Sequence, residues 1–178
     1  LDLALELKQK YADLPVIVLT PFSREVSMRL SLNKHELKKI DHVFSWLGHA
    51  EILLAIIKLV EDKMNVQDDI DEVGVQTILL VENSIRFYSS CLPLIYKIIF
   101  SQSKSFMTEG LNQHQQMLRM RGRPKILLAT NYEEAITLYE KYKDNMLGII
   151  SDVAFDIENK RDPEAGIKLI DHIRNEKP

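Results

Sequence analysis

The sequence predicts an α/β protein in which helices cover both faces of a parallel sheet. Three observations lead to this fold class. Five short apolar runs rich in β-branched residues are typical of strands that are buried on both faces. Helical segments, several of them clearly amphipathic, separate most of these runs. The 178 residues are 46% hydrophobic and 28% charged, which is typical of a globular protein and argues against disorder along the whole chain.

The expected elements alternate along the chain as a parallel sheet requires. Strands are expected at residues 16–19, 42–46, 77–81, 126–129 and 147–151. Helices are expected at residues 1–11, 23–32, 35–40, 50–64, 84–100, 108–120, 131–143 and 164–174. We expect Asn131 to cap the helix that follows it, Pro93 to bend its helix, and residues 155–163 to form a polar loop.

Composition and charge argue against several classes of protein. The 23 Lys and Arg residues against 26 Asp and Glu residues give a net charge of -3, so a protein-wide grip on nucleic acid is not expected. The single cysteine, Cys91, points to a cytoplasmic protein without disulfides. No apolar run reaches the roughly 18–20 residues that span a bilayer, so no membrane partner is expected. We interpret the basic run Arg119, Arg121, Arg123 and Lys125 as a solvated loop, with phosphate or nucleic-acid binding as the less favoured alternative.

Polar side chains follow several expected strands, at ends that meet along one edge of a parallel sheet. Glu82 and Asn83 follow the third strand, Asp152 follows the fifth, and Thr20 follows the first. Carboxylates from neighbouring strands can hold a hard divalent cation through oxygen ligands. Near that cation a carboxylate can accept a phosphoryl group, and a hydroxyl can hydrogen-bond the phosphoryl oxygens. Plainer roles stay open: a turn residue or helix cap for Asp152, a strand-end carboxylate for Glu82 and a strand cap for Thr20.

The motifs ILLVENS (78–84), IISD (149–152) and VIVLT (16–20) resemble the receiver domain of two-component response regulators. This resemblance implies a flavodoxin-like, three-layer α/β/α fold with a parallel five-stranded sheet. It implies that Asp152 is the phosphoacceptor and that Thr20 contacts the phosphoryl group. It also implies a weak Mg²⁺ site made by Glu82, Asn83, Asp152 and the carbonyl of Ala154. Receivers have a Lys at the end of the fifth strand, whereas Trp46 stands in that place here.

The receiver-like parts come in an unusual order. Residues 1–64 resemble the last part of one module, residues 76–178 resemble the first part of a second, and the acidic residues within 65–75 indicate a linker. We therefore expect a fragment of a longer protein that closes its sheet either as a circular permutation or by exchange of halves in a domain-swapped homodimer. The linker length, at about 3.3 Å per residue, permits both arrangements.

The resemblance implies signal reception and no enzyme activity of its own. The implied partners are a histidine kinase or phosphotransfer protein and an attached output domain. The alternative is a pseudo-receiver that takes no phosphoryl group, which Asn83 and Trp46 favour. Such a module would act by contact within a larger, phosphoenolpyruvate-utilising enzyme. The 107–123 insertion and the stretches HVFSWLG and VENSIRFYSSCLPLIYK are similar to the tandem receiver-like region ahead of bacterial pyruvate phosphate dikinase or phosphoenolpyruvate synthase-type domains.

Overall fold

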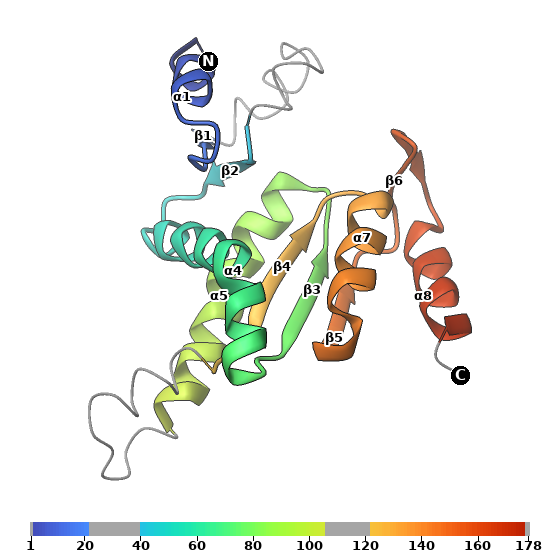
Figure 1. The fold of residues 1–178 in the computed structure, drawn as a ribbon. Coiled ribbons are helices and arrows are strands. Elements are labelled where there is room, and N and C mark those ends of the chain that lie inside the picture. The colour runs from blue at the N-terminus through green and yellow to red at the C-terminus, as the bar shows by residue number, and fades with distance from the viewer. Residues whose placement is uncertain (1, 22–39, 106–121, 177–178) are drawn as a thin grey trace.

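The computed structural model describes residues 2–21, 40–105 and 122–176 and has a mixed α/β architecture (Figure 1). In chain order the described elements are α1 (Asp2–Lys10), β1 (Ile17–Pro21), β2 (His42–Trp46), α4 (Glu51–Val73), β3 (Thr77–Val81), α5 (Ile85–Ser105), β4 (Lys125–Ala129), α7 (Tyr132–Tyr142), the 3-10 turn η2 (Lys143–Asn145), β5 (Met146–Ser151), β6 (Phe155–Ile157), β7 (Lys160–Asp162) and α8 (Ala165–Glu176). The five predicted strands are therefore confirmed to within two residues at each end. Within the described residues, no helix is both long and apolar enough to cross a membrane.

The central sheet has three parallel strands in the order β4-β3-β5. Nearly every side chain of β3 and β4 is buried, because helices cover both faces of the sheet (Figure 1). On one face Leu80, Ile126 and Leu128 pack with apolar side chains of α4 and α5. On the other face Leu79 and Leu127 pack with side chains of α7 and α8. The predicted α/β class with parallel strands between helices is thus confirmed for this sheet.

The strands β1 and β2 pair in parallel with each other, but in a second, separate sheet. Within the described residues, the five parallel strands therefore do not form the single five-stranded sheet that was expected. Side-chain contacts hold β2 against α5. Phe44 is fully buried and meets Tyr88 edge-on, the Tyr88 hydroxyl donates to the Val43 carbonyl, and the Ser45 amide donates to the Ser89 hydroxyl at 2.9 Å.

The helix α4 is longer than the sequence indicated. We expected it to end at residue 64 and residues 65–75 to form a linker, but the helix continues to Val73 and ends at Gly74 with a left-handed φ of 65°. The buried side chains of its second half explain the difference. Asp62, Val66 and Asp69 recur at helical spacing on the face that packs against the rest of the protein. Residues 65–73 are acidic, yet their one buried acid, Asp69, has its charge neutralised by Lys125, as described below.

The expected polar loop at residues 155–163 is also wrong, because β6 and β7 form an antiparallel hairpin there. Its two turn residues, Glu158 and Asn159, have φ values of 51° and 63°. Tight two-residue hairpin turns have a positive φ at both central positions. Asn tolerates this backbone conformation well. Phe155 anchors the hairpin in the core with no exposed surface.

Two further expectations concern helices. Asn131 does cap α7, since its side chain accepts a hydrogen bond from the Glu134 amide at 2.8 Å. Pro93 lies inside α5, which continues on both sides of it. The helices expected at 23–32, at most of 35–40 and at 108–120 lie outside the described residues.

Candidate functional site at the carboxyl end of the central sheet

Two carboxylate side chains follow neighbouring strands of the central sheet. Glu82 comes directly after β3, and Asp152 comes directly after β5. The Asp152 amide donates to the Val81 carbonyl at 2.9 Å, and the Glu82 amide donates to the Ala129 carbonyl at 3.0 Å. These bonds extend the strand pairing by one residue and fix both acidic residues at the carboxyl edge. Ligands bind at this edge in open parallel α/β sheets.

The two acidic side chains influence each other. Burial raises the pKa of the half-buried Glu82 carboxyl, and the nearby negative charge of Asp152 raises it further. A hydrogen bond from the Ser84 amide, at 2.8 Å, and the positive charge of Arg161 act in the opposite direction. Two carboxylates that repel each other at one edge form a place where a cation is favoured. The structure thus brings together the two acidic residues that the sequence indicated.

The backbone around Asp152 is closely packed against the start of α8. The Gly166 amide donates to the Val153 carbonyl at 2.9 Å. A Cβ atom at position 166 would lie 2.4 Å from the carbonyl oxygen of Asp152, so this position requires glycine. The Asp152 carboxylate also accepts a hydrogen bond from the Val153 amide at 2.7 Å. The backbone at Asp152 is therefore held in place by β3 on one side and by the start of α8 on the other.

Thr20 does not lie at this edge in the described arrangement. It lies at the end of β1 in the separate two-stranded sheet, where it is buried and its hydroxyl donates to the Pro21 carbonyl at 3.4 Å. Trp46, at the end of β2, belongs to the same sheet and is partly exposed. The sheet that carries Asp152 therefore contains neither of these two residues, because β1 and β2 do not join it.

The side chains at the edge fit a magnesium ion. Mg²⁺ keeps several waters and is commonly bound by only one or two carboxylates. Glu82 and Asp152 would supply two, and a cation between them would relieve the repulsion that raises the pKa of Glu82. Asn83 and Ala154 lie next to this pair in the chain, where an amide oxygen and a backbone carbonyl could add oxygen ligands. No group of three or more His, Cys, Asp or Glu residues that could hold a metal occurs in the described part of the chain.

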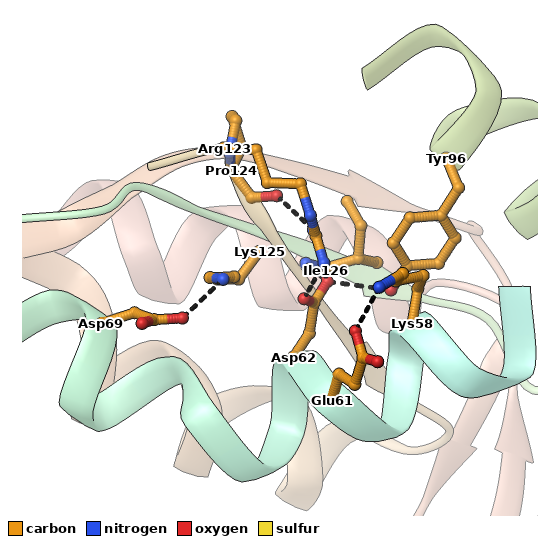
Figure 2. A network of polar contacts seen from close by, with 9 residues as sticks. All are labelled: Lys58, Glu61, Asp62, Asp69, Tyr96, Arg123, Pro124, Lys125 and Ile126. Carbon is orange, nitrogen blue, oxygen red and sulfur yellow. Dashed lines mark hydrogen bonds and ion pairs between the residues drawn. The ribbon is translucent and has the colours of Figure 1, made fainter. Parts of the chain in front are cut away.

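A second polar site, at the amino end of β4, was missed by the sequence analysis (Figure 2). Asp62 on α4 is fully buried and forms an ion pair with Arg123 at 2.6 Å. The Tyr96 hydroxyl and the Ile126 amide each donate to the same carboxylate at 2.9 Å. Burial and the Asp62 charge raise the pKa of Tyr96, which keeps its hydroxyl protonated as the donor.

A second ion pair, two turns further along α4, joins the helix to the first residue of β4. Lys125 and Asp69 lie 2.6 Å apart and are both almost completely buried (Figure 2). The expectation of a solvated basic loop is therefore wrong for Arg123 and Lys125, whereas Arg119 and Arg121 lie outside the described residues. The seven-residue spacing of the two aspartates was the available signal. It places them on one helix face, two turns apart.

No protein-family model matches the chain, and no match was found among curated proteins or solved structures.

Proposed function

We propose that this chain is receiver-like and that Asp152 accepts a phosphoryl group in a two-component phosphorelay. The observation that carries the proposal is the pairing of Glu82 and Asp152 at the carboxyl ends of neighbouring parallel strands, with the pKa of Glu82 raised in part by the Asp152 charge. Acidic groups in one another's field are typical of functional sites, although ion pairs that only stabilise a fold also shift pKa values.

The strand order supports a flavodoxin-like sheet. In that fold the order is 2-1-3-4-5, with the ligand at the carboxyl edge. The order β4-β3-β5 corresponds to its first three positions, and the parallel neighbours β1 and β2 correspond to its last two. In this proposal residues 76–178 form the first part of one receiver module and residues 1–64 form the last part of another. The helical residues of 65–73 join the two parts as a continuation of α4.

The proposed reaction is transfer of a phosphoryl group to a carboxylate. An oxygen of Asp152 attacks the phosphorus atom of a phosphohistidine or of acetyl phosphate. The new bond joins phosphorus to Asp152, and the old bond breaks with its electron pair left on the departing histidine or acetate. Mg²⁺, when bound by Glu82, Asp152, the Asn83 side chain and the Ala154 carbonyl, would neutralise charge on the phosphoryl oxygens. Gly166 lets the Asp152 backbone and α8 pack together and so keeps the attacking carboxylate in place.

The proposed partners follow from this chemistry. A histidine kinase or phosphotransfer protein supplies the phosphoryl group, and an attached output domain responds to it. The chain itself is then a switch and not an enzyme. We place it in the cytoplasm, where phosphohistidine donors and Mg²⁺ are available.

Intact-mass spectrometry after incubation with acetyl phosphate and Mg²⁺ tests the proposal. We expect the mass to increase by one phosphoryl group in the wild-type chain and not in the Asp152→Asn variant. Asp171→Asn is the matched control, because Asp171 is an exposed aspartate on α8, away from the strand ends. Equal labelling of the wild-type and Asp152→Asn chains would contradict the assignment.

Two observations favour a pseudo-receiver as the second candidate. Thr20, the hydroxyl expected to contact the phosphoryl group, lies in a separate sheet from Asp152, and Asn83 follows Glu82 where a second carboxylate would strengthen a cation site. A pseudo-receiver would act by contact within a larger phosphoenolpyruvate-utilising enzyme. It predicts no added mass with acetyl phosphate at any Mg²⁺ concentration, and no change in unfolding temperature on addition of Mg²⁺.

A further inference from the structure

The β6–β7 hairpin lies at the same sheet edge as Glu82 and Asp152. It begins three residues after Asp152, and Asp156 forms an isolated parallel bridge with Asn131, which follows β4. The hairpin turn is held to α7, since the Glu158 amide donates to the Glu133 carboxylate at 2.8 Å. The hairpin therefore lies next to the carboxyl end of β4 and close to Asp152 along the chain.

The strand register determines which hairpin side chains share a face. Arg161 pairs directly with Asp156, so their side chains lie on one face of the hairpin. Phe155 and Ile157 lie on the other face and pack into the core with α7 and α8. Arg161 and Asp156 consequently lie on the face that turns away from that core.

Arg161 has a positive charge available for a ligand. Its side chain is exposed, and it forms no ion pair with another described residue. The neighbouring Asp162, by contrast, is paired with Lys168 at 2.5 Å. The charge of Arg161 also lowers the pKa of the Glu82 carboxyl, which indicates that the guanidinium group lies within electrostatic range of the proposed site.

We infer that Arg161 binds the phosphoryl group at this edge, donating hydrogen bonds to its oxygens while Asp152 attacks. This inference rests on the proposed function and adds a catalytic residue to it. A dianionic phosphoryl group that approaches two carboxylates is repelled by both, so a second cation beside Mg²⁺ would lower that repulsion further. Guanidinium is well suited, because its planar fork donates two parallel hydrogen bonds to phosphate oxygens and its charge persists at every physiological pH.

Initial rates of Asp152 phosphorylation, followed by intact mass with acetyl phosphate and Mg²⁺, test the inference. We expect Arg161→Ala to lower the rate at least about tenfold, and Arg161→Lys to recover part of the loss, since it restores the charge without the fork. Lys160→Ala is the matched control, because Lys160 is an exposed cation on the same strand but on its other face. It should leave the rate within about twofold. A wild-type rate in Arg161→Ala would overturn the inference and leave the proposed function intact.

A second measurement distinguishes failure of the proposed function from failure of the inference about Arg161. The affinity for orthophosphate in the presence of Mg²⁺ is measured from shifts of the Glu82, Asn83 and Asp152 backbone amide resonances. If the wild-type chain takes no phosphoryl group, the proposed function fails. Weaker phosphate binding by Arg161→Ala than by Lys160→Ala would still support binding of the anion by Arg161. Equal affinities in these two variants would overturn it.

Discussion

At the scale of single residues, the charges buried beside α4 dominate the energetics. Asp62 accepts hydrogen bonds from Tyr96, from the Ile126 amide and from both terminal nitrogens of Arg123. A buried carboxylate costs several kcal/mol of desolvation, and here its partners offset that cost. Removal of one partner leaves the other charge buried and unpaired.

We therefore expect Asp62→Ala to lower the free energy of unfolding by about 3–5 kcal/mol, measured by urea denaturation. Asp68→Ala is the control, because Asp68 is an exposed acid on the same helix, and it should stay within about 0.5 kcal/mol of wild type. The double variant Asp62→Leu with Arg123→Met should recover much of the stability, since it removes both charges together. A loss below about 1 kcal/mol for Asp62→Ala would show that the network contributes little.

His42, at the start of β2, makes stability depend on pH. Burial, and then the charge of Lys63, lower the pKa of His42 to about 4 from its ordinary value of 6.5. Between these two values the unfolded chain binds the proton and the folded chain does not. The folded state is therefore favoured above pH 6.5, and this contribution is lost as the pH falls towards 4.

Unfolding curves of wild type and His42→Phe between pH 4 and pH 7 test this. The difference between the two pKa values corresponds to up to about 3 kcal/mol of unfolding free energy. The wild type should therefore lose up to that much more stability than the variant on acidification. Phe keeps the aromatic contact with Phe44, whose ring centre lies 6.3 Å from that of His42. The control His49→Ala, at an exposed position, should keep the wild-type slope. Parallel curves for wild type and His42→Phe would contradict a lowered pKa for this partly buried histidine.

At the scale of elements, local sequence predicted the strands and the α7 cap but not the extent of α4. Four consecutive apolar residues form Ile78–Val81, and Asn131 is a favoured N-cap residue directly before a helical pattern, so both are local signals. The acids within residues 65–73 resemble a solvated linker until their partners are known. The buried acid of this segment is Asp69, and its partner Lys125 is distant in sequence, so only the folded chain brings the two together. Arg123 pairs in the same way with Asp62, in the part of the helix that was predicted.

The hairpin was missed for a different reason. Tight hairpin turns are usually signalled by Asn-Gly or Asp-Gly, whereas this turn is Glu158-Asn159. Its strands also have only three residues each, which is too short for alternation to be recognised. Glu82 and Asp152 of the candidate site were therefore predictable from strand ends, whereas Arg161, on an unpredicted hairpin, was not.

A single proline substitution tests whether the second half of α4 is a helix or a linker. Gln67 is exposed, so its side chain contributes only a hydrogen bond to Asp71 at 3.2 Å. We expect Gln67→Pro to lower the free energy of unfolding by about 3 kcal/mol or more, because proline removes a helical hydrogen bond and clashes with the preceding turn. Gln67→Ala removes the same side chain and should cost less than about 0.5 kcal/mol. If the two variants were equally stable in urea, the segment would not be helical in solution.

At the scale of the whole molecule, the chain contains a three-stranded parallel sheet and a separate pair of parallel strands. β5 has apolar side chains that a completed parallel sheet would cover, and Leu147 and Ile150 are each about half exposed, at 52% and 50%. In the described residues no strand pairs with the outer edge of β5 or of β1. Residue patterns alone could not reveal that the strands divide into two sheets. The position of the β1–β2 pair depends on the packing of β2 against α5, which is a contact between segments that are distant in sequence.

The central claim is that Asp152 is the residue that takes the phosphoryl group. The most direct test is to label the wild-type chain with acetyl phosphate and Mg²⁺, digest it, and locate the added group by tandem mass spectrometry. We predict a single labelled peptide that contains Asp152, and loss of the label on treatment with hydroxylamine, which cleaves acyl phosphates. A label on any other residue, or a label that resists hydroxylamine, would contradict the account.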